Sequence, residues 1–303
     1  MPLSDLIPNP ARTLATWPTR PAVWARPADR FRDLLTLSEV DELIDTECLA
    51  ARNVVLIKDG TVLERHTYID GDMPRPGAVR AHLNNGGTVS IRQLQTIKPS
   101  LSRLQREIQE ETGCQVHVNA YYTPPKSQGL KYHYDPYVTL IVQLSGRKKW
   151  PLQPPLVENP MLEYGNFLGR GFTHDERVFL AQTPPAETFT LSPGSVFWLP
   201  RGYVHSPYTD GDEPSLHLTF AIKERTYHWV AEQMTREVLD QALVDPAIRA
   251  QVAVGGLGSD TEAAVAHMRE YLIGALLLMD SKEIAELATA AARQPGAVVS
   301  ARR

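Results

Sequence analysis

Between residues 115 and 225 the chain alternates short apolar runs with turns rich in Pro and Gly. The first run, Gln115 to Tyr121, alternates with a period of two, as a half-buried strand does. Further candidate strands follow at 137–144, 148–153, 177–180, 187–191, 195–199 and 214–222. Short strands separated by regular turn signals are typical of a β-sandwich or barrel. The 24 prolines argue against an all-helical protein, because proline disrupts helix interiors.

The chain before this region predicts an arm followed by mixed α/β elements. Residues 1–35 are rich in Pro and Arg, and we expect an extended arm that Trp17 and Trp24 pin to the body. The expected elements after it are a helix from Ser38, a strand over 53–57, a hairpin turn at Asp59-Gly60 with a partner strand over 61–69, and a helix opened by Ser100 and ended by Gly113. The expected domain therefore spans residues 36–225 and contains both these elements and the strand-rich region.

Residues 226–303 have a helical pattern. The expected features are a helix from Trp229 to Leu243, a break at 255–258, a capping box at Ser259–Glu262, a helix with an apolar seam from Val265 to Met279, and a last helix from Ser281. The seam is more apolar than a single exposed helix needs. We expect it to form a homodimer interface, and a buried intramolecular core is the alternative.

Composition excludes several classes of protein. The net charge is −4 and no run of Lys or Arg is longer than Arg147-Lys148-Lys149, so we expect no nucleic-acid partner. The two cysteines form no C-x-x-C pair, which argues against a disulfide framework and fits a cytoplasmic protein. No apolar leader begins the chain, and the longest apolar run, Tyr271 to Met279, is too short to span a membrane. We therefore expect no membrane association.

Three residues form a candidate metal site. His133 and Asp135 are two apart, so on a strand both side chains point to the same face. His174-Asp175-Glu176 has similar spacing, but it follows a Gly-rich loop and not a clear strand. The third candidate ligand is His205, which follows the strand 195–199 and a Pro-Arg-Gly turn. Two His and one carboxylate leave coordination positions open, as in non-haem Fe(II) oxygenases, whereas structural zinc sites close with four ligands. For His205 the alternative is a loop histidine bonded to backbone.

Five motifs agree in order and spacing with a known family. They are N-x-Y-x-T-P-P-x-S-x-G from Asn119, H-x-D from His133, Q-L-x-G-R-K-K-W from Gln143, L-x-P-G-x-x-x-x-L-P-R-G-x-x-H from Leu191, and S-x-H-L-T from Ser215. With them, residues 30–225 resemble the JmjC-type cupins of the cupin 4 group, which are ribosomal-oxygenase-like hydroxylases dependent on 2-oxoglutarate and Fe(II). The resemblance implies a mostly β fold: a double-stranded β-helix (jelly-roll) core with N-terminal α/β elements and a C-terminal helical region.

The resemblance also implies how the cosubstrate binds. In this family a Lys or Arg fifteen residues after the first metal His holds the far carboxylate of 2-oxoglutarate, and here that residue is Lys148. A partly buried carboxylate needs such a cation to offset its desolvation. Asn119 and Tyr121 match positions that hydrogen-bond the cosubstrate, and Ser215, with His217 and Thr219, shares a strand face that can line the same cavity. Ordinary strand packing stays an alternative for each of these polar residues.

The implied activity is that of a dioxygenase. O2 and 2-oxoglutarate would give succinate and CO2, while an amino-acid side chain in a protein or peptide is hydroxylated. Those relatives carry a winged-helix domain after the dimerising helices, and the roughly 78 residues after residue 225 leave little room for one, which puts a ribosomal substrate in doubt. The alternatives are hydroxylation of a small-molecule or peptide natural product, demethylation of methyl-lysine at the same iron site, and a non-catalytic cupin binding module.

Overall fold

The computed structural model describes residues 2–161, 171–251 and 261–293. The chain divides into two compact units, residues 1–223 and 224–303, and each is described by itself. The predicted boundary after residue 225 lies two residues beyond this division. Among the described residues, no helix is both long and apolar enough to cross a membrane.

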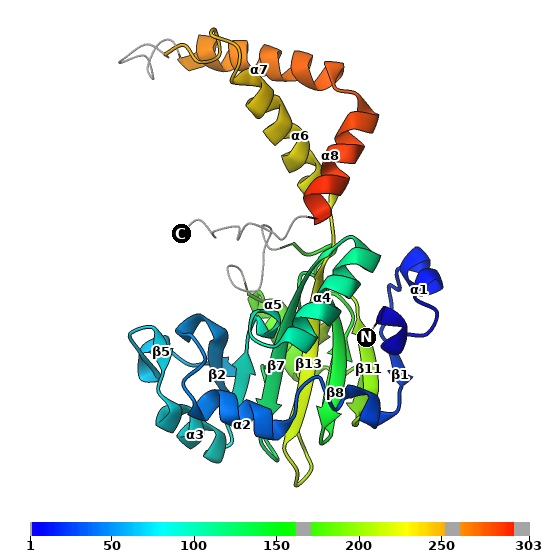
Figure 1. Ribbon diagram of the computed structural model, residues 1–303, viewed down its shortest axis with the longest axis vertical. Helices are drawn as coiled ribbons and strands as arrows, with labels where there is room; N and C mark the ends of the chain where they lie inside the picture. Colours follow the sequence, from blue (N-terminus) through cyan, green and yellow to red (C-terminus); the bar gives the residue numbers. More distant parts are fainter. Residues whose placement is uncertain (1, 162–170, 252–260, 294–303) are drawn as a thin grey trace. The chain divides into compact units, whose positions relative to one another are not determined.

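The first unit is built on an eight-stranded antiparallel sheet (Figure 1). In sheet order its strands are β1 (Ala22–Ala25), β11 (Ser195–Leu199), β8 (Val138–Ser145), β13 (Ser215–Lys223), β7 (Gln115–Thr123), β6 (Thr88–Ile91), β2 (Val54–Lys58) and β3 (Thr61–Val62). The long pair β7 and β13 is at its centre, with Tyr121 opposite His217 and Asn119 opposite Thr219. The period-two pattern that predicted β7 is confirmed.

A second sheet has three strands in the order β10 (Glu187–Leu191), β9 (Lys148–Gln153) and β12 (Val204–His205). Side chains from both sheets meet in one apolar cluster, which joins Ile141 and Phe197 of the large sheet to Trp150 and Leu152 of the small one. The two sheets therefore pack face to face, as a β-sandwich requires. A separate hairpin pairs β4 (Ile69–Asp70) with β5 (Met73–Pro74).

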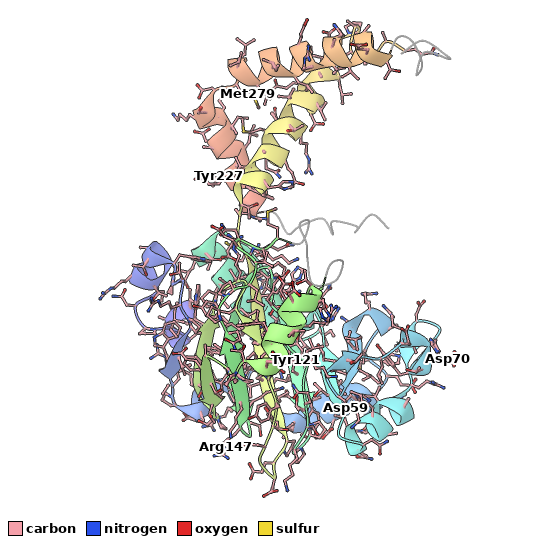
Figure 2. The ribbon with its side chains drawn as sticks, turned by 180° about the vertical axis from the view of Figure 1, so that it is seen from behind. Asp59, Asp70, Tyr121, Arg147, Tyr227 and Met279 are labelled. Atoms are coloured by element: carbon pink, nitrogen blue, oxygen red, sulfur yellow. The ribbon has the colours of Figure 1, made fainter. Side chains whose placement is uncertain are left out.

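The two faces of the large sheet differ in chemistry. One face carries alternate apolar residues such as Val118, Leu140 and Leu218, which form the main core with Leu104 of α4 (Pro99–Thr112). Figure 1 shows α4 lying across this face. The other face carries the polar partners of that alternation and faces the small sheet, because side chains along a strand point alternately to opposite faces. Figure 2 views the molecule from behind and labels Tyr121 of this inner face.

The remaining helices of the first unit surround these sheets. They are η1 (Leu3–Asp5), α1 (Pro10–Thr16), η2 (Ala28–Phe31), α2 (Leu37–Asp45), η3 (Ala51–Asn53), η4 (Arg65–Thr67), α3 (Pro76–Asn84), η5 (Leu94–Thr96) and α5 (His174–Gln182). The capping box predicted near Ser38 is present two residues earlier, where Thr36 and Glu39 bond each other's backbone N–H groups. Gly113 ends α4 with a φ of 66°, as predicted, because glycine adopts left-handed backbone without strain. The cap expected from Ser100 is absent: Pro99 is the first residue of α4, and Lys98 precedes it without a side-chain cap.

The structure corrects the extended arm predicted for residues 1–35. This segment forms η1, α1, β1 and η2, and β1 pairs with β11 at the edge of the large sheet. Leu3, Leu6 and Ile7 are buried in the main core. Trp17 packs edge-on against Trp198 at 5.2 Å, so the predicted anchoring role of this residue is confirmed. The Pro-rich composition gave no sign that these three apolar side chains are part of the core.

Two strand predictions also fail. Residues 177–180 lie within helix α5, which begins with a capping box formed by Thr173 and Glu176. The partner strand expected over 61–69 contains only Thr61 and Val62, and a 3-10 turn follows at Arg65–Thr67. In both places a short apolar run is compatible with either a helix or a strand, so the neighbouring caps and turns decide.

The second unit consists of helices α6 (Tyr227–Ala242), α7 (Thr261–Leu278) and α8 (Ser281–Arg293), as the helical pattern predicted. Arg225 lies over the ring of Trp229 at 4.4 Å. The break predicted at 255–258 and the first half of the capping box predicted at Ser259–Glu262 lie outside the described residues. Helix α7 contains no buried residue, although it is the most apolar of the three helices.

Candidate metal centre

The three predicted metal ligands lie together at one end of the two sheets. One ligand atom from each of His133, Asp135 and His205 lies within 4.8 Å of those of the other two. The imidazole centroids are 4.1 Å apart, and His205 Nε2 is 3.7 Å from Asp135 Oδ2. No other group of metal-binding side chains with this spacing occurs in the described parts of the chain. His174 instead lies in the first turn of α5.

Backbone pairing sets the distance between the two histidines. His133 N donates to His205 O at 3.0 Å, and His205 N donates to His133 O at 2.8 Å, forming an isolated antiparallel bridge. Gly202 N also donates to Asp135 O at 2.9 Å, which ties the turn before His205 to the third ligand. Segments far apart in the sequence therefore present their side chains in a fixed register.

Each imidazole is oriented through its second nitrogen. His133 Nδ1 lies 2.7 Å from Lys131 O, and His205 Nδ1 lies 2.9 Å from Tyr203 O. A carbonyl only accepts, so both Nδ1 atoms carry the proton and both Nε2 lone pairs are available to a cation. Burial holds the pKa of His205 well below its usual value, with a smaller electrostatic contribution from His133, so this imidazole is neutral. A neutral imidazole is the form that binds a metal.

The residues between the ligands face the opposite way and pack. Tyr134, between His133 and Asp135, is buried with Val157, Leu180 and Val204. Val204 precedes His205, so the same alternation operates on both ligand strands. This small apolar cluster, which includes Leu180 of α5, packs against one face of both segments. The opposite face carries the candidate ligands.

Asp135 lies in a site that disfavours its charge. Burial raises the pKa of Asp135, while the charge of His133, a hydrogen bond from Tyr137 and the charge of Arg92 act in the opposite direction. A carboxylate in such a place gains from a bound cation, because the cation offsets its desolvation. The ligand set of two neutral nitrogens and one carboxylate oxygen therefore fits a divalent metal such as Fe(II).

Lys148 lies deep between the sheets. It is 1% exposed, and its Nζ donates to Thr123 Oγ1 at 2.6 Å. Burial lowers the pKa of Lys148 to about 7. No carboxylate of the described residues pairs with it, since burial is the sole cause of its pKa shift. A buried cation without a protein counter-ion indicates a place for an anionic ligand.

Aromatic rings line the space near Lys148 and His205. His217 stacks on Tyr121 with centroids 5.0 Å apart, and Trp150 lies 5.4 Å from His217 and 5.6 Å from His205. His217 Nδ1 and Trp150 Nε1 are buried and have no hydrogen-bond partner among the described residues. Buried polar groups are normally paired, so these two atoms fit a site that a ligand completes.

Two predicted cosubstrate ligands already have protein partners. Asn119 Oδ1 accepts from Gln93 N at 3.1 Å, and Ser215 Oγ accepts from Gln143 Nε2 at 2.8 Å. Both lie on strands of the inner face, as predicted. Their contact with a cosubstrate, like that of Tyr121, stays a prediction.

Sequence reasoning missed two residues of the site. Thr123 continues the inner-face alternation of Asn119 and Tyr121, and Tyr137 stands two residues after Asp135. The i+2 spacing places both on the correct face. Their bonds to Lys148 and Asp135 depend on how distant strands meet, which the spacing alone does not reveal.

Two facing antiparallel sheets with a His-x-Asp…His cluster at one end define a cupin-type double-stranded β-helix with a metal-site ligand set. Residues 90–230 match the JmjC domain family, the family that the motifs resemble.

Curated relatives are similar to the chain in sequence. The chain is 28% identical over 220 residues to a Drosophila persimilis protein named bifunctional lysine-specific demethylase and histidyl-hydroxylase NO66, covering 70% of this chain and 30% of that protein. It is 28% identical over 198 residues to the protein of the same name from Culex quinquefasciatus, covering 64% of this chain and 29% of the relative. The chain thus spans less than a third of the length of these relatives.

Solved structures share the fold. The Escherichia coli ribosomal oxygenase YcfD superposes with a TM-score of 0.58 at 17% identity, over 93% of this chain and 70% of that chain. Its complex with cobalt and 2-oxoglutarate superposes with a TM-score of 0.57 at 15% identity, over 95% and 72%. The predicted double-stranded β-helix core is therefore confirmed.

Proposed function

We propose that this protein is an Fe(II)- and 2-oxoglutarate-dependent dioxygenase that hydroxylates an amino-acid side chain in a protein or peptide. The observation that carries the proposal is the cluster of His133, Asp135 and His205, whose ligand atoms lie within 4.8 Å of one another. Relatives named histidyl-hydroxylases and a similar fold that binds cobalt and 2-oxoglutarate support it.

The chain's own residues would hold and orient the reactants. The Nε2 atoms of His133 and His205 and the Asp135 carboxylate would bind the iron on one side, leaving its other positions for cosubstrate and O2. Bound iron, with 2-oxoglutarate and O2, supplies the oxidising chemistry that amino-acid side chains lack. The apolar packing of Tyr134 behind the ligands keeps water from that side of the site.

Lys148 would bind the far carboxylate of 2-oxoglutarate. Its burial and its lack of a described carboxylate partner support this role, because the bound dianion would restore its full charge. Asn119, Tyr121 and Ser215 would bind the same molecule from the inner face of the large sheet. The unpaired Nδ1 of His217 and the unpaired Nε1–H of Trp150 add capacity for polar atoms of a ligand.

The direct test is turnover of 2-oxoglutarate to succinate with Fe(II), ascorbate and O2. We expect turnover in the wild type and loss of both turnover and Fe(II) binding in His133→Ala. His174→Ala is the matched control, because this histidine lies in helix α5 outside the cluster, and it should retain both. Iron binding that survives His133→Ala, without turnover of 2-oxoglutarate in the wild type, would reject the enzyme assignment.

The substrate is tested by mass spectrometry of extracts incubated with the enzyme. A protein or peptide that gains the mass of one oxygen atom supports the proposal. Oxygen gained only by a small molecule would redirect it to natural-product hydroxylation, and loss of a methyl group from lysine would redirect it to demethylation.

We also propose that the chain acts as a cytoplasmic homodimer through α7. Leu277 and Leu278 of this helix are 80% and 88% exposed, and α7 has no buried residue. An apolar surface of this kind is a typical protein–protein contact. The chain has only two cysteines and no C-x-x-C pair, which supports a reducing compartment.

A further inference from the structure

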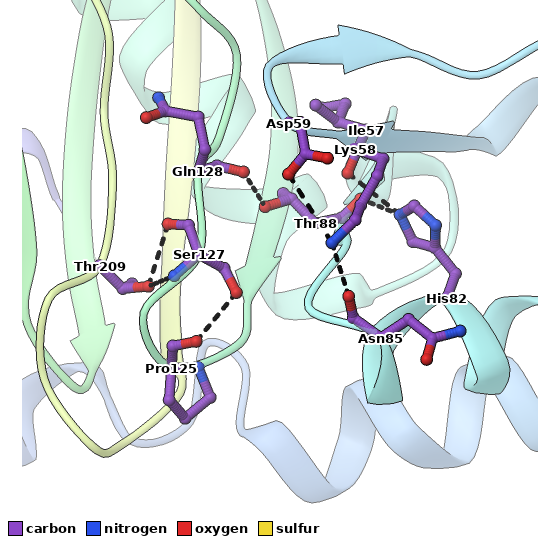
Figure 3. Close-up of polar contacts among 10 residues, drawn as sticks. All are labelled: Ile57, Lys58, Asp59, His82, Asn85, Thr88, Pro125, Ser127, Gln128 and Thr209. Atoms are coloured by element: carbon purple, nitrogen blue, oxygen red, sulfur yellow. Dashed lines mark hydrogen bonds and ion pairs between the residues drawn. The ribbon is translucent and has the colours of Figure 1, made fainter.

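A line of buried hydroxyl groups runs from Lys148 toward the N-terminal α/β elements. Lys148 Nζ donates to Thr123 Oγ1 at 2.6 Å, and Thr123 Oγ1 lies 3.1 Å from Thr88 Oγ1. Thr88 Oγ1 in turn lies 3.2 Å from the carbonyl oxygen of Gln128, a contact drawn in Figure 3. Thr88 and Thr123 are fully buried. The line therefore connects three strands, β9, β7 and β6, to the loop that leads to His133.

The two ends of this line orient both hydroxyl groups. A carbonyl oxygen only accepts and a protonated ammonium only donates. Thr88 Oγ1 donates toward Thr123 Oγ1 and toward the carbonyl oxygen of Gln128. Thr123 Oγ1 therefore accepts from both Thr88 and Lys148, and a hydroxyl oxygen has two lone pairs for this purpose. The two donors hold the Thr123 oxygen between them, with one lone pair facing Lys148.

We propose that Thr88 is a positioning residue for the cosubstrate anchor, because its hydroxyl orients Thr123 and thereby holds Lys148 Nζ in place for the far carboxylate of a dicarboxylic keto acid. The inference rests on the proposed function. Thr88 acts through Thr123, so it is not itself a ligand-binding residue.

The surroundings of Lys148 explain why one oriented acceptor matters. Burial alone lowers the pKa of Lys148 to about 7, and Thr123 Oγ1 is its acceptor among the described residues. The titratable group that faces it from β13 is His217, whose own pKa burial and the charge of Lys148 hold well below the usual value. No neighbouring acid of the described chain keeps the ammonium charged, so the dipole of the Thr123 hydroxyl has unusual weight.

Thr88 is itself held firmly. His82 Nε2 lies 3.1 Å from both Thr88 O and Ile57 O, and these contacts are visible in Figure 3. A side chain at Gly87 would meet the His82 ring at 2.2 Å, so glycine is required beside Thr88 for this approach. At the other end, the side-chain amide of Gln128 donates to Ser206 Oγ at 3.1 Å. Because Thr88 and Gln128 are both held by further hydrogen bonds, the line of hydroxyl groups can fix the position of Lys148 Nζ.

The test compares Thr88→Val, which removes the hydroxyl at nearly constant shape, with Thr88→Ser, which retains it. The affinity for 2-oxoglutarate is measured by calorimetry with Fe(II) under anaerobic conditions. We expect Thr88→Val to weaken binding roughly three- to tenfold, the range for one lost neutral hydrogen bond, with unchanged Fe(II) affinity. Thr88→Ser should bind as the wild type does. Thr88→Ala serves the same purpose if the Val variant does not fold.

Ser127→Ala is the matched control. Its hydroxyl donates to Pro125 O at 2.9 Å in the same loop as Gln128 but takes no part in the line. We expect its affinity for 2-oxoglutarate to equal that of the wild type. An equal loss of affinity in Ser127→Ala and Thr88→Val would overturn the proposal, because general loosening of the loop would then explain both.

A second readout does not depend on the cosubstrate. NMR of lysines labelled at Cε follows the titration of Lys148 in the metal-free protein, with Lys148→Met to assign the signal. We expect a lower titration midpoint in Thr88→Val than in the wild type and an unchanged one in Thr88→Ser. Should the wild type fail to bind 2-oxoglutarate, the proposed function fails, but this titration still decides the role of Thr88. A midpoint unchanged by Thr88→Val overturns the inference.

Discussion

At the scale of single residues, the site consists of buried polar side chains, and hydrogen bonds or nearby charges offset the cost of removing them from water. Asp135 has Tyr137 and His133 beside it, and each imidazole has a backbone carbonyl behind it. The sequence alone predicted that His133 and Asp135 lie together, because i,i+2 spacing on a strand places both side chains on one face. It did not identify Tyr137 or Thr123, because a hydrogen-bond partner depends on three-dimensional positions that strand periodicity leaves open.

Tyr137→Phe tests the support of the metal ligand. Removing the phenol hydroxyl takes away a hydrogen bond that holds Asp135 in its ionised form. We expect Fe(II) affinity to fall roughly tenfold to a hundredfold, the usual effect of losing such a partner. Calorimetric titration with Fe(II) measures it, and Tyr227→Phe, at a 96% exposed position, is the control. Equal affinities in wild type and Tyr137→Phe would contradict the expectation.

The pKa of Lys148 has a consequence for stability. Its folded value of about 7 lies below the usual value of 10.5, so between these limits the unfolded chain binds more protons than the folded one. Stability of the metal-free protein should therefore rise from pH 7 toward pH 10, by at most about 1.4 kcal/mol per pH unit from this group. Urea unfolding at several pH values measures it. The rise should be weaker in Lys148→Met, and identical slopes in the two proteins would contradict the burial of a low-pKa lysine.

At the scale of elements, local signals predicted strands well where they were long and alternating. β7 and β13 have uninterrupted period-two patterns, and both appear within one or two residues of the expected bounds. The strand predicted over residues 177–180 was wrong, because a run of four residues rich in apolar side chains does not distinguish a helix from a strand. The capping box of Thr173 and Glu176, three residues apart, was the signal that identifies α5.

The N-terminal segment gives an element-scale test. Leu6 is fully buried in the main core, so Leu6→Ala should lower the free energy of unfolding by about 2–5 kcal/mol. An arm draped over the surface would lose almost nothing. Chemical denaturation measures the change, and Val62→Ala, at a position 49% exposed, provides the comparison. If Leu6→Ala lowered the free energy of unfolding no more than Val62→Ala does, the extended arm would again be the better description of residues 1–35.

At the scale of the whole molecule, the two units differ in how far they bury their apolar side chains. The first unit has a continuous core between α4 and the large sheet. The second exposes Leu277 and Leu278 on a helix without a buried residue. Sequence patterning located this apolar helix but left its partner open, because periodicity shows that a face needs covering and not what covers it.

Leu277→Glu tests the proposed homodimer. A charge on a buried apolar contact is costly, so the variant should sediment as a monomer at concentrations where the wild type is a dimer. Arg269→Glu changes the charge of an exposed residue on the same helix and should leave the dimer intact. Analytical ultracentrifugation distinguishes the two, and a wild type that remains monomeric at all concentrations would reject the interface.

The reciprocal backbone bridge between His133 and His205 does not depend on their side chains. Main-chain pairing holds these two residues in register through backbone N–H and C=O groups alone. Replacing either imidazole should therefore leave the two segments at the same spacing. Under the proposed function, we expect a variant that lacks one of these imidazoles to lose its metal while keeping its fold.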